Sequence, residues 1–353
     1  MLMVVFGAGA SHDSVPKANW NLELKANAEN RRPPIASHLF DLHRRSFLAA
    51  AERFDVAGAG GLIMNLQAAA HHESESVEKH LQGQALLAEG GDVVVQCHLL
   101  AVRYYLKEVV EGSTFSWEKL AAGHTNYRAL LNKLDQHRRG TNESVLLVTF
   151  NYDLLLEHAL RREFEIEKPN LASYPEGPYH LIKPHGSTNW FRINERVEDL
   201  PPELVIKEGG VVDQSMPVTM SEKPRPGWLP ALAVPTFSKS SFECPPEHER
   251  ALANLLSEVD RLLVIGWKGQ EKTFLDMCAD RIPYGLNGLV VSHEIGSATT
   301  IARHLGESIP GSRILPSSRT GFSHALGWDR TVDAVWNGEP EVRTGATSAD
   351  NPR

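Results

Sequence analysis

Short, mostly apolar runs alternate with longer stretches of mixed polarity along most of the chain. The apolar runs have the length and β-branched content of buried strands, and they fall at Met1–Phe6, Val145–Thr149, 179–190, 261–267 and 288–294. The third of them runs into a polar turn. Stretches with the spacing of amphipathic helices follow at 154–164, 247–259 and 273–281. This alternation predicts an α/β protein with a Rossmann-like, mostly parallel sheet and helices on both of its faces.

A long helical stretch interrupts the alternation between the first two strands. Its apolar residues recur with the i, i+4, i+7 spacing of an amphipathic helix, most clearly at Val95, Leu99, Val102 and Leu106. Asp92, directly after two glycines, has the residue type and position of an N-cap. We therefore predict an inserted helical module at 35–139 and a Rossmann-like core formed by 1–34 together with 140–337. Stretches without periodicity predict two loops and a flexible tail, at 14–34, 196–228 and 338–353.

Composition and charge narrow the class of protein. The 353 residues are 42% apolar and 23% charged, which is typical of a globular chain. The formal net charge of −8 argues against direct nucleic-acid binding by this chain alone. No apolar stretch approaches the roughly 20 residues of a membrane-spanning helix, and the N-terminal run lacks the basic flank of a signal peptide. These features predict a cytoplasmic protein without membrane contact.

The cysteines predict no metal centre. The chain contains three of them, Cys97, Cys244 and Cys278, and they are widely separated. They form no Cys-x-x-Cys pair, so neither a zinc ribbon nor a disulfide framework is expected.

The first strand ends abruptly on Gly7-Ala8-Gly9-Ala10-Ser11. Glycines permit a tight turn, and amide groups near a helix N-terminus can face an anion such as a phosphate. The alternative is an ordinary strand-to-helix turn. Three further predicted strands also end on small or polar residues, in the segments TFNYD at 149–153, KPHGS at 183–187 and IGWKG at 265–269. Because ligands of open parallel sheets bind outside the carboxyl ends of the strands, these four ends predict one site.

These segments resemble the signature segments of the sirtuin fold, namely a GAG-x-S phosphate loop, a T-x-N-x-D strand end and an HG pair. The resemblance is closer to the sirtuin-like NAD hydrolase domains of bacterial antiphage-defence proteins, which also show RPP before LF, K-x-HGS-x-NW, and P-T before a lysine. The corresponding residues here are Arg32-Pro33-Pro34, Leu39-Phe40, the segment 183–190, Pro235-Thr236 and Lys239. The matching segments are spread over residues 3–305 in the same order.

The resemblance implies roles for residues at these strand ends. Asn151 would hold the water or the ribose, and Asp153 would lie at the nicotinamide pocket. His185 would be the general base, which suits an imidazole with a pKa of about 6.5. The remaining implied contacts to the dinucleotide come from the turn and from the other strand ends, at Gly7, Ala8, Gly9, Ser11, Gly186, Gly266 and Trp267.

Structural interpretations of the same residues stay open. Asn151 could cap the following helix, Asp153 could compensate the helix dipole, and His185 is one of 16 histidines. Trp190 fits a core position better than a stacking platform, and Lys239 fits an ordinary surface position.

The fourth strand end departs from the pattern of the resembling proteins, many of which have a serine after the glycine. This chain has Trp267 and Lys268 instead. Trp267 could stack on a ring, and Lys268 could meet a phosphate. Alternatively, this end of the site is remodelled and binds a different nucleotide.

The resemblance implies a hydrolase that cleaves its substrate NAD+ to nicotinamide and ADP-ribose. Deacylating sirtuins carry a four-cysteine zinc module, which three scattered cysteines cannot build, so water is the favoured acceptor. Because an unregulated hydrolase would drain the cell of NAD+, we expect gating in antiphage defence by homo-oligomerisation or by a partner such as a HerA-like ATPase or a short Argonaute. Two alternatives stay open: a non-catalytic subunit that binds NAD or ADP-ribose, and a protein ADP-ribosyltransferase or deacylase.

Overall fold

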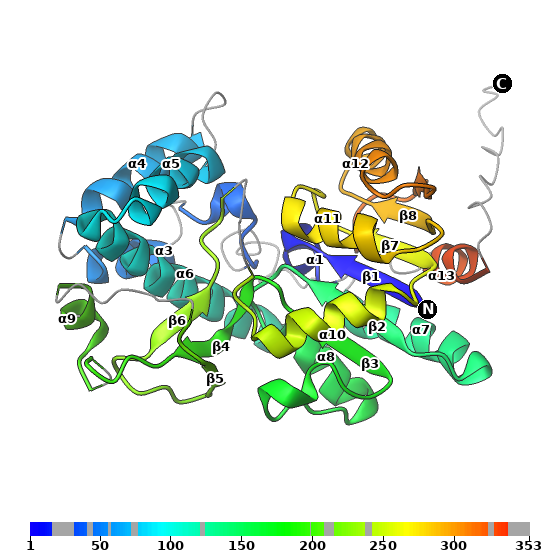
Figure 1. The fold of residues 1–353 in the computed structure, drawn as a ribbon, viewed down its shortest axis with the longest axis horizontal. Coiled ribbons are helices and arrows are strands. Elements are labelled where there is room, and N and C mark those ends of the chain that lie inside the picture. The colour runs from blue at the N-terminus through cyan, green and yellow to red at the C-terminus, as the bar shows by residue number, and fades with distance from the viewer. Residues whose placement is uncertain are drawn as a thin grey trace, which may run out of the picture.

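Six parallel strands form the central sheet, in the order β3-β2-β1-β7-β8-β9 (Figure 1). The strands span Tyr179–Ile182 (β3), Val145–Thr149 (β2), Leu2–Phe6 (β1), Arg261–Ile265 (β7), Asn287–Val291 (β8) and Arg313–Pro316 (β9). Numbered along the chain, these six strands have the doubly wound order 3-2-1-4-5-6, in which the winding reverses between β1 and β7. The predicted Rossmann-like fold is confirmed. The four-residue strand β9 is an addition that the sequence pattern did not predict.

The computed structural model describes residues 1–15, 32–40, 45–55, 58–71, 77–120, 124–197, 199–207, 215–236, 242–323 and 328–337. The predicted tail 338–353, most of the predicted loop 14–34, and Lys239 lie outside the described residues.

Three helices cover each face of the sheet. On one face α7, α8 and α13 pack against Leu2, Val4 and Phe6, and on the other face α10, α11 and α12 pack against Met3 and Val5. Alternate residues of β1 thus serve two cores, as expected for a strand that is buried on both faces. The helices span Asn126–Thr141 (α7), Leu155–Phe164 (α8), Trp328–Asn337 (α13), Pro246–Leu256 (α10), Lys272–Arg281 (α11) and Ile295–Ser308 (α12).

A second, antiparallel sheet lies beside the first and has the order β5-β4-β6. Its strands are Val218–Met220 (β5), Gly186–Arg192 (β4) and Leu229–Leu232 (β6). The prediction of a polar turn after the third strand is therefore wrong for 186–190, and the predicted loop 196–228 contains β5 and the helix α9 (Pro202–Lys207). The sequence of β4, GSTNWFR, lacks the polar–apolar alternation that marks a half-buried strand, although six of its seven residues are buried.

The inserted helices form their own hydrophobic core. The helices α3 (Arg45–Arg53), α4 (Ala59–His71), α5 (Val77–Glu89) and α6 (Val93–Leu120) are grouped on the left of Figure 1. Their buried side chains meet Leu229 and Leu232 of β6. Asp92 caps α6 as predicted, since its Oδ1 accepts a hydrogen bond from the Val95 amide at 3.1 Å.

Helix α7 belongs to the core of the large sheet, although the predicted module 35–139 included most of it. Its buried residues Leu130, Leu131 and Leu134 pack in the cluster that contains Leu2 and Val4 of β1. Among the described residues, the remaining short elements are α1 (Ala8–His12) and two single 3-10 turns, η2 (Ala36–His38) and η3 (Leu171–Ser173). The division of the chain into domains stays a prediction.

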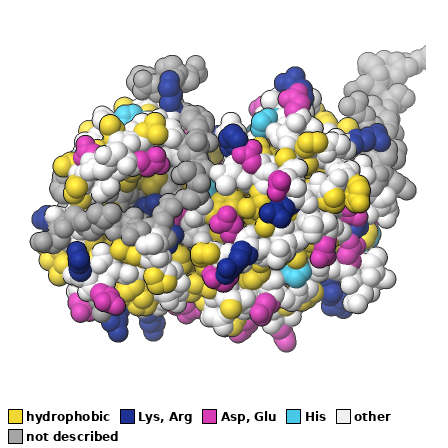
Figure 2. Space-filling model, viewed as in Figure 1, with side chains coloured by type: hydrophobic (Ala, Val, Ile, Leu, Met, Phe, Trp, Pro, Cys, Tyr) yellow, Lys and Arg dark blue, Asp and Glu magenta, His cyan; other side chains and the backbone are white. Residues whose placement is uncertain are grey.

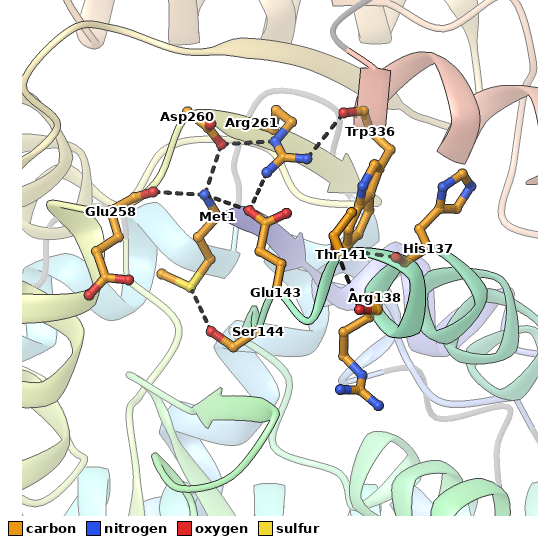
Figure 3. Close-up of polar contacts among 10 residues, drawn as sticks. All are labelled: Met1, His137, Arg138, Thr141, Glu143, Ser144, Glu258, Asp260, Arg261 and Trp336. Atoms are coloured by element: carbon orange, nitrogen blue, oxygen red, sulfur yellow. Dashed lines mark hydrogen bonds and ion pairs between the residues drawn. The ribbon is translucent and has the colours of Figure 1, made fainter.

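Charged groups tie the amino ends of the strands together (Figure 3). The Met1 ammonium pairs with Glu143 Oε1 and with Asp260 Oδ1, each at 2.9 Å. Arg261 bridges the two carboxylates and also donates to the Trp336 carbonyl oxygen at 3.1 Å. These contacts fix the starts of β1, β2 and β7 at the edge of the sheet opposite to the four predicted strand ends.

The surface carries mixed charges. Figure 2 shows acidic and basic side chains interspersed with hydrophobic ones over this face of the molecule. Within the described part of the chain, no helix combines the length and the apolar character that crossing a membrane requires.

Candidate functional site

The turn after β1 is bonded to the end of β7, its neighbour at the point where the winding reverses. The Gly7 amide donates to Ile265 O at 3.0 Å, and the Gly9 amide donates to Gly266 O at 3.1 Å. The Ala10 amide donates to Gly7 O at 2.9 Å. These three N–H groups are therefore engaged within the protein, so an anion at this turn would have to be held by other groups. A cofactor role for the turn stays a prediction.

Close backbone packing explains two of the glycines. A Cβ on Gly7 would come within 2.5 Å of Gly266 O, and a Cβ on Gly266 would come within 2.4 Å of the Ala10 nitrogen. Gly266 also has a φ of +61°, a conformation that L side chains rarely adopt. The glycines thus let the β1–α1 turn rest directly on the end of β7, whether or not a phosphate also binds there.

We expect Gly266→Ala to lower the free energy of unfolding by about 3 kcal/mol or more, because the new methyl group meets backbone and the positive φ is strained. Gly112→Ala is the matched control. Gly112 lies inside α6 with no atom within 4 Å of an added Cβ, so this change should raise stability by roughly 0.5–1 kcal/mol. Urea unfolding measures both. Equal stability of wild type and Gly266→Ala would show that the two backbones separate at no cost.

Asn151 is bonded to the same turn. Its Nδ2 donates to Gly7 O and to Ser11 Oγ, each at 2.9 Å, and it lies 3.3 Å from Tyr127 OH. Ser11 Oγ and Tyr127 OH are themselves 2.9 Å apart. The predicted association of Asn151 with the Gly7–Ser11 turn is therefore present as direct hydrogen bonds. Capping of the following helix is not its role in this geometry.

Tyr127 is the member of this cluster that the sequence interpretation missed. The residue lies in α7, within the predicted helical module, and is fully enclosed. Burial raises the pKa of Tyr127 well above its ordinary value, so its hydroxyl stays protonated. A signal was available, since Tyr127 shares the i, i+3, i+4, i+7 spacing of Leu130, Leu131 and Leu134 and thus the buried face of the helix.

Asp153 is buried and bonded to the start of α8. Its Oδ1 accepts a hydrogen bond from the Leu155 amide at 3.0 Å, which agrees with the helix-terminus interpretation of this residue. Burial raises the pKa of Asp153, although Lys183 and the Ser11 hydroxyl both act in the opposite direction. A role at a nicotinamide pocket stays a prediction.

His185 lies in the connection between β3 and β4, and its side chain is buried. Its ring lies edge-on to Phe150 at a centroid distance of 4.7 Å and tilted against Tyr152 at 6.4 Å. Phe150 and Tyr152 are the chain neighbours of Asn151. Within the segment 150–152, the side-chain amide of Asn151 faces the glycine turn, and the rings of the two flanking residues face the imidazole of His185. Both predicted catalytic residues therefore lie near the end of β2.

Trp267 stacks on protein. Its ring lies 5.1 Å from the ring of Phe150, at an angle of 9°. It also packs edge-on to Phe274, at 5.6 Å. Only 4% of Trp267 is exposed. The sequence suggested that Trp267 stacks on a ring, and on at least one face of the indole that ring is Phe150. A contact between Trp267 and a cofactor stays a prediction.

Gly186 is explained by a close approach of two strands. Its φ is +80°, and an added Cβ would come within 1.9 Å of Ala231 O on β6. This packing requires glycine without any ligand. Lys183, three residues earlier, belongs to the same sequence motif, and its side chain is completely buried. Its Nζ donates to Asp153 O at 2.5 Å, to Glu157 Oε1 at 2.8 Å and to Ser187 Oγ at 2.9 Å.

Two further motif residues have structural contacts. Arg32 Nε donates to His12 O at 2.7 Å, and its Nη2 lies 3.2 Å from Asp13 Oδ1, which attaches the RPP segment to the end of α1. Trp190 is completely buried, as the core interpretation predicts. Lys268 is exposed and lies 3.4 Å from Glu78 Oε1 of the helical module.

The cysteines lie apart in the structure. Cys97, Cys244 and Cys278 are all buried and free. Among the described residues, no three His, Cys, Asp or Glu side chains gather as metal ligands would. The expectation that the protein needs no metal stays a prediction.

Comparisons with known proteins give no family assignment. No protein-family model matches the chain, and no curated protein matches it. One solved structure, described as "Structural Basis for the Mechanism and Regulation of Sir2 Enzymes", is similar with 10% sequence identity and a TM-score of 0.38, over 95% of this chain and 92% of that chain. A likeness of this size identifies neither a family nor an activity.

Proposed function

We propose that this protein is an NAD+ glycohydrolase, which cleaves NAD+ to nicotinamide and ADP-ribose. The observation that carries the proposal is the bonding of Asn151 Nδ2 to Gly7 O and Ser11 Oγ. It joins two of the three sirtuin-like segments where the sheet reverses its winding, the place at which doubly wound folds bind dinucleotides. The third segment, with His185, is joined to the same strand end through Phe150.

The chemistry assigns a role to each group. The bond between the ribose C1′ and the nicotinamide nitrogen breaks, and nicotinamide leaves with the bonding electron pair. The ribose passes through an oxocarbenium-like state, as in glycoside hydrolysis. A water oxygen bonds to C1′, and the water proton goes to the imidazole of His185. Asn151 would orient the water or the ribose. No described residue donates a hydrogen bond to Asn151 Oδ1, so this oxygen is available to a ligand.

Water is the proposed acceptor because the three cysteines cannot build the four-cysteine module of deacylating sirtuins. We further propose that the activity is gated in antiphage defence. Gating would come from homo-oligomerisation or from a separate partner, such as a HerA-like ATPase or a short Argonaute. This part of the proposal rests on the motif resemblance and on the cost of unregulated NAD+ loss.

Nicotinamide release by the purified protein tests the proposal. The protein is incubated with NAD+ across a range of protein concentrations, because assembly could switch the activity on, and free nicotinamide and ADP-ribose are quantified. We expect equal amounts of both products without any acyl peptide. Release only with an acylated peptide would support a deacylase. NAD+ binding without turnover in every oligomeric state, measured by calorimetry, would support a non-catalytic subunit.

A further inference from the structure

Arg103 connects the helical module to the segment that carries His185. The residue lies in α6, and its side chain is only 13% exposed. One guanidinium nitrogen donates to the carbonyl oxygen of Leu232, the last residue of β6. Another donates to Glu243 Oε1 at 2.8 Å. A single side chain of the module thus holds two separate points of the segment 232–243.

The residues at these two points hold the backbone on both sides of the imidazole. The amide of Ala233, next to Leu232, donates to His185 O at 2.9 Å. The amide of Glu243 donates to Pro184 O at 2.8 Å. Tyr152, whose ring lies against the imidazole, donates through its hydroxyl to Ala233 O at 2.7 Å.

Charge pairing makes this connection sensitive to the position of α6. The Glu243 carboxylate is buried between Arg103 and Arg192, and Arg192 Nη2 lies 3.0 Å from its Oε2. Burial alone would raise the pKa of Glu243, but the two guanidinium groups hold the pKa below its ordinary value. Glu243 is therefore an ionised, enclosed anion, and such a group depends strongly on the placement of its partners.

We propose that Arg103 is a positioning residue that sets the orientation of His185 and so couples the placement of the helical module to the rate of NAD+ cleavage. The proposal rests on the proposed function. It gives gating a physical route, because any event that shifts α6 against β6 changes the support of the Pro184–His185 backbone. Within the described part of the chain, the hydrogen bonds of Arg103 go to Leu232 and Glu243 and those of Asn151 Nδ2 go to the Gly7–Ser11 turn and Tyr127, so substrate binding should be affected less than turnover.

Arg103→Met removes both donors and keeps the aliphatic part of the side chain. We expect kcat for nicotinamide release to fall about 10- to 100-fold, the scale of a small misplacement of a catalytic group, with KM for NAD+ unchanged within about twofold. Arg103→Lys, which keeps the charge, should restore part of the kcat. Arg53→Met is the matched control, because Arg53 pairs with Glu108 of the module and with Glu203 of α9, away from His185, and its replacement should leave kcat unchanged.

A second measurement does not need turnover. In protein labelled with 13C-histidine, the ring signal of His185 is identified by its loss in His185→Gln. We expect this signal to shift in Arg103→Met and to stay in place in Arg53→Met. An unchanged His185 signal together with an unchanged kcat overturns the inference. If the wild type releases no nicotinamide, the proposed function fails and the ring signal alone decides the coupling. If Arg103→Met does not fold, kcat and the ring signal of His185 are measured in Arg103→Lys instead.

Discussion

His185→Ala is expected to lower kcat for nicotinamide release by about 10²- to 10⁴-fold, the usual contribution of a general base. The loss should be selective for turnover. The imidazole packs against Phe150 and Tyr152, whereas the backbone of this segment is held separately by the Ala233 and Glu243 amides. Removing the ring therefore removes the proposed proton acceptor and should leave the connection between β3 and β4 in place. Steady-state release of nicotinamide, with circular dichroism for folding, measures the effect.

His180→Ala provides the matched control. His180 lies on β3, the strand before His185, and its Nδ1 is 2.6 Å from Pro175 O, outside the candidate site. Its replacement should leave kcat unchanged. A folded His185→Ala protein with full activity would remove the imidazole from the mechanism. Asn151→Ala is a less direct test, because it also removes the hydrogen bonds that Asn151 donates to Gly7 O and Ser11 Oγ.

The large sheet could be predicted from the sequence because its strands carry a strong local signal. β1, β2 and β7 are buried on both faces, so they read as continuous apolar runs. Helices with one apolar face separate them, and the parallel topology follows from that alternation. The convergence of four strand ends follows from the topology alone, which is why Asn151 could be associated with the Gly7–Ser11 turn.

The small sheet could not be predicted because its strands depend on distant partners. β4 pairs with β6, which begins 37 positions after Arg192, the last residue of β4. The register of β4 against β6 shifts between the pairs of Gly186 and Phe191. Such an irregularity interrupts the two-residue period on which strand prediction depends. This sheet matters for the site, since β6 leads into the backbone that holds His185.

The glycines show the limit of interpreting a motif from its residue types. The sequence at Gly7 and Gly266 fits a phosphate turn, and the structure gives an independent reason for both glycines in the contact of two backbones. Glycine can be required both for phosphate binding and for the contact of the two backbones, and the two reasons are independent. Nucleotide binding by a folded variant tests the requirement for phosphate binding.

Lys183→Met should produce a large loss of stability. The Lys183 ammonium is fully enclosed, and its charge is balanced by Glu157, whose side chain is 10% exposed. Glu157 Oε2 has no hydrogen-bond partner among the described residues, and Oε1 would keep only the Tyr174 hydroxyl at 3.2 Å. An anion left unpaired in such a place costs about 3–5 kcal/mol of unfolding free energy. Urea unfolding at pH 7 measures the loss.

A double substitution separates charge from shape. Lys183→Met/Glu157→Gln removes the unpaired Glu157 charge, so most of the lost stability should return, and the stability lost in the double variant should be clearly smaller than the sum of the two single losses. Lys272→Met, which breaks the exposed pair with Asp276, should change stability by no more than about 0.5 kcal/mol. If the double variant is as unstable as Lys183→Met, the ion pair is not the cause. The stabilising contacts of Lys183 would then be its hydrogen bonds to Asp153 O, which precedes α8, and to Ser187 Oγ of β4.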